Sequence, residues 1–202
     1  MNERIGIFGG TFDPPHLGHL ILASESRAQL NLTRLLFVLT PTPPHKLNQP
    51  VSSIADRLVM LRVALKDEPA FELSTTEMER PGPHYTFDTI QFLADKNRGA
   101  DLILLLGGDS LRDLPTWHRP ADLVAACRQI GVMRRPGDSI ELSALERQIP
   151  GVTAKVKFVE APLLEIASRE IRRRASSGRP FRYYLLPSVY NYIVEHKLYQ
   201  KP

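Results

Sequence analysis

Short apolar runs alternate along this chain with longer stretches of helical spacing. The runs cover residues 4–8, 35–40, 102–106, 129–133 and 156–159, and most of their residues are apolar, as in buried parallel strands. The helical stretches cover residues 20–30, 54–65, 87–95 and 142–149. This alternation predicts an α/β fold with a doubly wound parallel sheet, whose ligands bind beyond the carboxyl ends of the strands.

The alternation ends before the C-terminal segment. There the sequence predicts a helix from Ser168 and another from Ser188, which follows Pro187, and each serine can cap free backbone N–H groups. No low-complexity linker separates two halves of the chain. We therefore expect one domain over residues 1–202, with a small helical appendage over about residues 163–202.

The amino-acid composition indicates a globular protein and argues against a membrane-spanning one. Hydrophobic residues make up 43% of the chain and charged residues 24%, as in ordinary globular domains. The longest aliphatic run, residues 102–106, is far shorter than the roughly 20 apolar residues of a membrane span, so we expect no membrane partner. The single cysteine, Cys127, lies in an apolar stretch, which predicts an inert thiol and a cytoplasmic location.

The chain is basic, with a net charge of +4. That charge suits nucleic acid, and it equally suits a pocket that collects the phosphates of a small substrate. The densest basic cluster, Arg172, Arg173 and Arg174, has no interleaved aromatic residues, and such runs are usually solvated faces. We expect no nucleic-acid partner, and the sequence leaves the oligomeric state open.

The first apolar run leads directly into G-G-T-F-D-P-P-H-L-G-H, residues 9–19. Gly9 and Gly10 would let backbone N–H groups approach phosphate oxygens. A helix that begins near Pro15 or His16 would point its positive end at the same anion. A phosphate site is the prediction.

Two histidines stand within this segment. His16 and His19 are three residues apart and share a face of the helix, while Gly18 between them leaves room for a ligand. An isolated H-x-G-H tetrapeptide is as often a turn with incidental histidines, but the glycines and the position after a strand favour the phosphate site. No third ligand lies nearby, so we expect no dedicated metal site.

Residues 10–19 resemble the G-x-F-x-P-x-H-x-G-H signature of the nucleotidyltransferase superfamily. Further stretches match in order along nearly the whole chain, and they narrow the resemblance to bacterial nicotinate-nucleotide adenylyltransferases. The resemblance implies a Rossmann-like nucleotidyltransferase fold and transfer of the adenylyl group of ATP to nicotinate mononucleotide in NAD biosynthesis. Across these stretches it implies ATP contacts at Gly9, Gly10, Thr11, Phe12, Gly18, Gly107, Asp109, Ser168 and Arg172.

The matching stretches also imply a site for the acceptor. Pro43–Pro44–His45–Lys46 resembles a P-P-H-K loop that contacts substrate phosphate, although His45 and Lys46 alone would suggest only a solvated turn. The segments around Tyr85, Thr86, Trp117 and His118 resemble those that line a nicotinate pocket.

The residue types of that pocket make physical sense. Trp117 could stack on a pyridinium ring, and the backbone N–H groups of Thr86 and His118 could receive a carboxylate. From sequence alone, Trp117 is at least as often a packing anchor, and Gly-Asp at Asp109 is also ordinary turn chemistry.

Residues 166–172, I-A-S-R-E-I-R, are similar to an I-S-S-T-x-I-R motif that grips ATP phosphates at a helix start. Ser168 as N-cap would place Arg172 one turn along the same face. Ala167 and Arg169 depart from the motif, so hydroxyl contacts of the family are absent here or replaced by Arg169.

These groups suit direct in-line attack of the acceptor phosphate on the α-phosphorus of ATP, with His16 and His19 stabilising charge. Mg²⁺ would arrive on the ATP phosphates, and Arg134 could hold the acceptor phosphate. The alternatives are another acceptor (nicotinamide mononucleotide, phosphopantetheine or FMN), a non-catalytic ATP-binding sensor, and a basic protein that binds nucleic acid.

Overall fold

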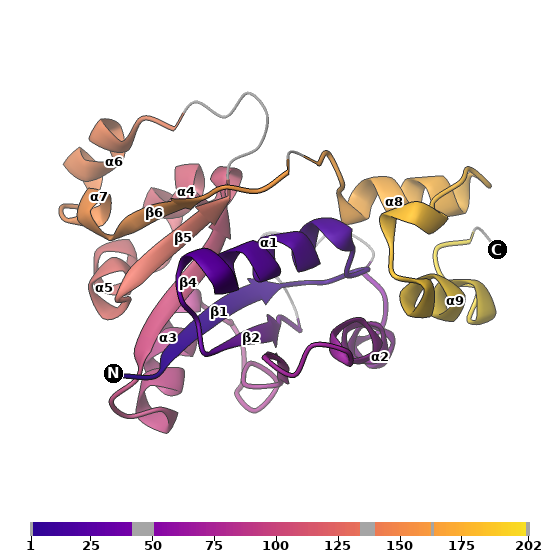
Figure 1. Ribbon diagram of the computed structural model, residues 1–202, viewed down its shortest axis with the longest axis horizontal. Helices are drawn as coiled ribbons and strands as arrows, with labels where there is room; N and C mark the ends of the chain where they lie inside the picture. The colour runs from indigo at the N-terminus through magenta and orange to yellow at the C-terminus, as the bar shows by residue number, and fades with distance from the viewer. Residues whose placement is uncertain (1, 42–50, 134–139, 163, 201–202) are drawn as a thin grey trace.

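The computed structural model describes residues 2–41, 51–133, 140–162 and 164–200. These residues form a six-stranded sheet, all parallel, in the order β3-β2-β1-β4-β5-β6 (Figure 1). The strands are β1 (Arg4–Gly10), β2 (Arg34–Leu39), β3 (Phe71–Ser74), β4 (Asp101–Gly107), β5 (Gln129–Met133) and β6 (Val156–Val159). The predicted parallel sheet is confirmed.

Helices cover both faces of the sheet (Figure 1). On one face lie α1 (Leu17–Gln29) and α2 (Ile54–Leu65). On the other lie α3 (Thr86–Lys96), α4 (Gly108–Asp113), α5 (Pro120–Ala126), α6 (Leu142–Gln148) and α7 (Val152–Lys155). Two short 3₁₀ turns, η2 (Leu114–Thr116) and η3 (Arg182–Tyr184), and two further helices, α8 (Ser168–Ser176) and α9 (Pro187–Glu195), complete the described elements.

The strands are apolar because both faces of the sheet are buried. In β1, Ile5 and Ile7 pack into the core beneath α3 and α5, while Phe8 packs into the core beneath α1 and α2. In β2, Leu36 joins the first core and Phe37 the second. An uninterrupted apolar run is the pattern of a strand that is covered on two sides.

The strand order reverses beside β1, which lies between β2 and β4. The chain first builds outward from β1 through β2 to β3, then crosses back to β4 on the other side of β1 and continues to β6. The carboxyl ends of β1 and β4 therefore form the crevice where a doubly wound sheet binds its ligands.

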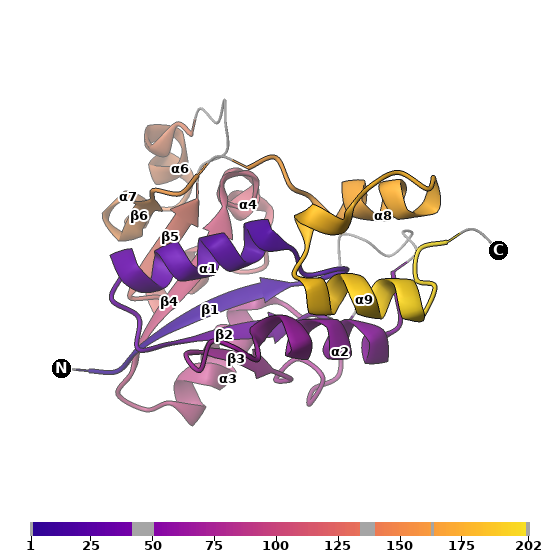
Figure 2. The ribbon, with the colours of Figure 1, turned by 45° about the vertical axis from the view of Figure 1, so that its right-hand side comes forward.

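The C-terminal helices pack against α2 rather than on the sheet. Figure 2 shows α9 lying along α2, beyond the carboxyl end of β1. The contact is a third apolar cluster, built on Met60, Ile171, Val189 and Ile193. The predicted helical C-terminal part is confirmed, whereas a single domain over residues 1–202 stays a prediction.

The predicted serine caps are wrong. The N-cap of α8 is Ala167, and the Ser168 hydroxyl donates instead to the carbonyl oxygen of Pro14 at 2.9 Å. The N-cap of α9 is Leu186, and the Ser188 hydroxyl donates to the carbonyl oxygen of Val63 at 3.2 Å. Both hydroxyls thus join the C-terminal helices to the rest of the protein instead of satisfying their own helix ends. No described helix has the length and apolarity that crossing a membrane requires.

Candidate active site

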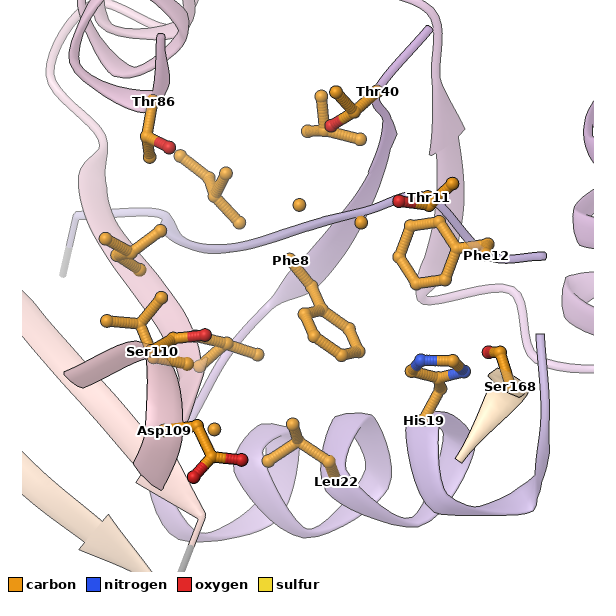
Figure 3. A pocket seen from close by; sticks show the side chains of 18 of the residues that line it. Phe8, Thr11, Phe12, His19, Leu22, Thr40, Thr86, Asp109, Ser110 and Ser168 are labelled. Carbon is orange, nitrogen blue, oxygen red and sulfur yellow. The ribbon is translucent and has the colours of Figure 1, made fainter. Parts of the chain in front are cut away.

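A cavity of about 710 Å³ lies at the carboxyl ends of β1 and β4 (Figure 3). All the predicted site residues within the described ranges line it: Gly9, Gly10, Thr11, Phe12, His16, Gly18, His19, Tyr85, Thr86, Gly107, Asp109, Trp117, His118, Ser168 and Arg172. The predicted residues His45, Lys46 and Arg134 lie outside the described ranges. Segments far apart in the sequence therefore meet around one space.

The two histidines stack on each other at the start of α1. Their ring centroids are 3.7 Å apart with an angle of 23° between the planes, and His16 is 6% exposed. The backbone N–H of His16, the N-cap residue, donates to Nδ1 of His19 at 3.1 Å. Because Nδ1 of His19 accepts, the neutral ring carries its proton on Nε2. Figure 3 shows this ring beside Phe12 and Ser168.

Gly18 makes room for His16. A Cβ atom at Gly18 would lie 3.1 Å from Nδ1 and 3.2 Å from Cε1 of the His16 ring. The glycine was expected to leave room for a ligand. The structure shows that the place a Cβ would occupy lies against the buried imidazole of His16, while Gly18 also lines the cavity, so its contact with a ligand stays a prediction.

Phe12 fixes the turn between β1 and α1. Its φ is +47°, a left-handed conformation that a bulky residue adopts only where packing requires it. The ring is 2% exposed and lies 5.5 Å from both Phe8 and Phe37, and 5.2 Å from His19. The buried ring thus anchors the loop, residues 11–16, that carries the histidines.

Arg57 lies beneath this loop and was not predicted. It is 2% exposed, and its guanidinium donates to the carbonyl oxygens of Thr40 and Pro41 at 2.8 Å and of Ser52 at 3.1 Å. Burial lowers the pKa of Arg57, and the nearby Asp13 carboxylate opposes that change. Its position three and four residues before the buried Met60 and Leu61 was the available signal in the sequence.

Asp13 joins the loop to the C-terminal helices. It is 2% exposed, and its Oδ2 accepts from the backbone N–H of Ser52 at 3.1 Å. Nη1 of Arg172 donates to the Asp13 carbonyl oxygen at 2.7 Å and lies 3.9 Å from Oδ2. Arg172 therefore lines the cavity while it is already bonded to the loop.

The far side of the cavity is aromatic. The rings of Tyr85 and His118 stack with centroids 4.2 Å apart and 24° between planes. Trp117 is half-buried, lines the cavity and also packs against the core, so its packing position is shown, while its stacking on a pyridinium ring stays a prediction. Thr86 is the first residue of α3, where helical N–H groups have no partner within the helix.

Buried polar side chains that sequence reasoning missed stand next to this wall. The Thr89 hydroxyl donates to Oε1 of Glu77 at 2.8 Å and accepts from Arg80 at 2.8 Å. Glu77 and Thr89, both buried, line the cavity. Within the described ranges, no three His, Cys, Asp or Glu residues are grouped as a metal site would require.

Known proteins resemble this chain along almost its full length. A model of the family described as "Cytidylyltransferase-like" matches residues 7–174. A protein of Thermomicrobium roseum named "Probable nicotinate-nucleotide adenylyltransferase" is 44% identical over 98% of this chain and 92% of its own length. The "Nicotinate-nucleotide adenylyltransferase" of Bacillus subtilis is 37% identical over 98% of this chain and 99% of its own length.

The chain belongs to the nicotinate-nucleotide adenylyltransferase family. It is therefore a nucleotidyltransferase enzyme, and the resemblance drawn from the motifs is confirmed. Among solved structures, it superposes on "Plasmodium falciparum nicotinic acid mononucleotide adenylyltransferase complexed with NaAD" with a TM-score of 0.80, 20% identity and coverage of 98% of both chains. At 20% sequence identity, this structural similarity shows the fold alone, and that fold is the predicted Rossmann-like one.

In this chain, the two departures from the helix-start motif lie on the cavity wall. Ala167 is the N-cap of α8, and the exposed Arg169 stands in its first turn. A small N-cap leaves the first N–H groups of α8 without a side-chain cap, and Arg169 adds positive charge beside them.

Proposed function

We propose that this chain transfers the adenylyl group of ATP to nicotinate mononucleotide, giving nicotinate adenine dinucleotide and pyrophosphate in NAD biosynthesis. The observation that carries the proposal is one cavity with two chemically different walls. The stacked histidines and the start of α8 form one wall, and the Tyr85–His118 stack with Trp117 forms the other. A volume of about 710 Å³ lies within the range of pockets that bind small molecules.

The first wall suits the triphosphate of ATP. It combines the glycine-rich end of β1 with the N-terminal ends of α1 and α8, and helix N-termini favour anions. Thr11 and Phe12 contribute the loop around it, Gly18 lies in the first turn of α1, and Ser168 and Arg172 close the wall from the C-terminal part. Gly107 at the end of β4 and Asp109 in the first turn of α4 would face the rest of the ATP molecule.

The second wall suits nicotinate. Trp117 and the neighbouring stack offer π faces to a positively charged pyridine ring, and the N–H groups of Thr86 and His118 would receive the carboxylate. His45, Lys46 and Arg134 are proposed, on the resemblance alone, to hold the acceptor phosphate.

The reaction needs no nucleophile from the protein. The acceptor phosphate attacks the α-phosphorus of ATP in line, a new P–O bond forms, and the bond to the leaving pyrophosphate breaks. Alignment and stabilisation of charge then supply the catalysis, and we assign His16 and His19 to that stabilisation. Mg²⁺ would enter as Mg-ATP, and the single buried Cys127 is consistent with work in the cytoplasm.

The test is pyrophosphate release from Mg-ATP in the presence of one acceptor at a time. Nicotinate mononucleotide, nicotinamide mononucleotide, FMN and phosphopantetheine are compared at equal concentration. Release with the nicotinate form alone is the expected result. Release only with another acceptor would overturn the acceptor assignment, and ATP binding without release for any of the four would indicate a nucleotide sensor.

A further inference from the structure

The end of the chain returns to the β1–α1 loop. The hydroxyl of Tyr199 donates to Oδ1 of Asp13 at 2.7 Å, across 186 positions of sequence, and lies 3.8 Å from Sδ of Met60. Burial first, and then the Asp13 carboxylate, raise the pKa of Tyr199 above its usual range, so the hydroxyl keeps its proton and acts as a donor. This contact connects the segment after α9 to the motif that the sequence singled out.

Asp13 depends on these external donors. Its carboxylate is 2% exposed, Oδ1 receives the Tyr199 hydroxyl and Oδ2 receives the Ser52 N–H. A buried carboxylate oxygen that loses its donor is left with an uncompensated desolvation cost, so its position shifts or its surroundings rearrange. Through this hydrogen bond, Tyr199 thus helps to fix the position of the Asp13 side chain.

The position of Asp13 affects two parts of the cavity wall. Its carbonyl oxygen holds Arg172, and the carbonyl oxygen of the next residue, Pro14, accepts from Ser168. His16 follows three residues after Asp13 and begins α1. A shift of Asp13 therefore moves the histidines relative to α8.

Backbone conformation supports a fixed geometry here. Phe12, directly before Asp13, has φ +47°, and Tyr199 has φ +64°. Left-handed conformations of bulky residues cost free energy and persist where the surroundings impose them, often next to functional sites. The surrounding structure therefore imposes the backbone conformations of Phe12 and Tyr199, which these residues would not adopt by intrinsic preference.

We propose that Tyr199 is a positioning residue of the active site, which sets the ATP-binding wall through its hydrogen bond to Asp13. This role rests on the proposed adenylyl transfer. It predicts that loss of the Tyr199 hydroxyl lowers kcat/KM for ATP. The affinity for the acceptor should not change, because the wall of Tyr85 and Trp117 has no contact with Tyr199 among those described.

The experiment compares Tyr199→Phe with a matched control, Tyr192→Phe. Tyr192 also donates its hydroxyl to an aspartate, Oδ1 of Asp56 at 2.9 Å, at the contact of α9 with α2 but away from the cavity. Each variant loses one tyrosine–carboxylate hydrogen bond from the C-terminal part. Thermal unfolding is measured first, and the KM for ATP, the KM for nicotinate mononucleotide and kcat are then measured below both transitions.

We expect both variants to fold, with the larger drop in melting temperature for Tyr199→Phe, because its partner Asp13 is buried whereas Asp56 is only partly buried. Tyr199→Phe should lose about tenfold or more in kcat/KM for ATP, with the acceptor KM within about twofold of wild type, because misplacement of reacting groups acts on rate more than on remote binding. Tyr192→Phe should retain wild-type kinetics. Equal kinetics in the two variants, or failure of Tyr199→Phe to fold, would overturn the positioning role, whereas a wild-type protein without turnover would instead overturn the proposed function.

Discussion

His19 uses its two ring nitrogens differently. Nδ1 accepts from the His16 N–H and so helps to begin α1, while the ring proton is on Nε2. An asparagine can imitate the first of these functions, because its side-chain oxygen can accept the same N–H, but it does not reach as far as Nε2. The structural and chemical functions of this histidine can therefore be separated.

We predict that His19→Asn loses about 10²–10³ in turnover, the typical effect of removing one preorganised donor, while it unfolds close to the wild-type temperature. His19→Ala should lose as much turnover and in addition about 1 kcal/mol of stability, because the cap is also lost. Steady-state rates and thermal unfolding check both. Near-normal turnover of a folded His19→Asn variant would remove His19 from the chemistry.

Gly18→Ala should separate stability from activity. Alanine favours helix over glycine by up to about 1 kcal/mol, so stability should hold or rise. The new methyl group would lie about 3.1 Å from the His16 ring, which must then move by several tenths of an ångström. We expect at least about a tenfold loss of turnover. Unchanged turnover would mean that the place of His16 is not critical.

Cys127 should be chemically silent in the native state. Burial raises the pKa of its thiol to about 12, so at pH 8 the proton stays on sulfur and the reactive thiolate is missing. A colourimetric thiol reagent should therefore find no reactive thiol in the folded protein and one per chain in denaturant. Rapid labelling of folded protein at pH 8 would contradict the buried position.

At the scale of elements, α2 connects the sheet to the C-terminal helices. Its buried Arg57 bonds to carbonyl oxygens at the end of β2 and before α2 itself, and its buried Met60 packs on α8 and α9. Removal of the guanidinium would leave those carbonyl groups without their donor in the interior, and it would take one positive charge away from the neighbourhood of the Asp13 carboxylate.

We predict that Arg57→Met lowers the free energy of unfolding by about 3–5 kcal/mol. Arg62→Met, an exposed position on the same helix, should change it by no more than about 0.5 kcal/mol. Urea unfolding of the two variants measures the difference. Equal stability would show that the bonds of Arg57 contribute no more than a surface side chain.

Helices and strands with a clear spacing of apolar residues could be predicted from the sequence, and those without such a spacing could not. The stretch over residues 54–65 coincides with α2, because its apolar residues recur at helical spacing. The strand β3 was missed because Phe71–Ser74 is a four-residue edge strand that is half-buried throughout and has no apolar run. The helices α4, α5 and α7 were missed because each is too short to show several apolar residues at helical spacing.

At the scale of the whole molecule, the sequence predicts the fold class and the place of the candidate site. Both depend on the alternation of strands and helices along the chain and on the motifs that follow the strands. The predicted residues that are described all line one cavity at the reversal of strand order. Arg57 and Tyr199 were not assigned to the site, because their importance comes from partners far away in the chain. The hydroxyl of Ser168 was given the wrong partner for the same reason.

The central claim is that this cavity joins the adenylyl group of ATP to the nicotinate form of the acceptor. The most direct measurement offers equal amounts of nicotinate mononucleotide and nicotinamide mononucleotide with limiting Mg-ATP in one reaction, and quantifies the two dinucleotide products by chromatography with mass detection. The proposed carboxylate contacts predict an excess of nicotinate adenine dinucleotide of at least about tenfold. Equal amounts of the two products, or an excess of the amide dinucleotide, would contradict the claim.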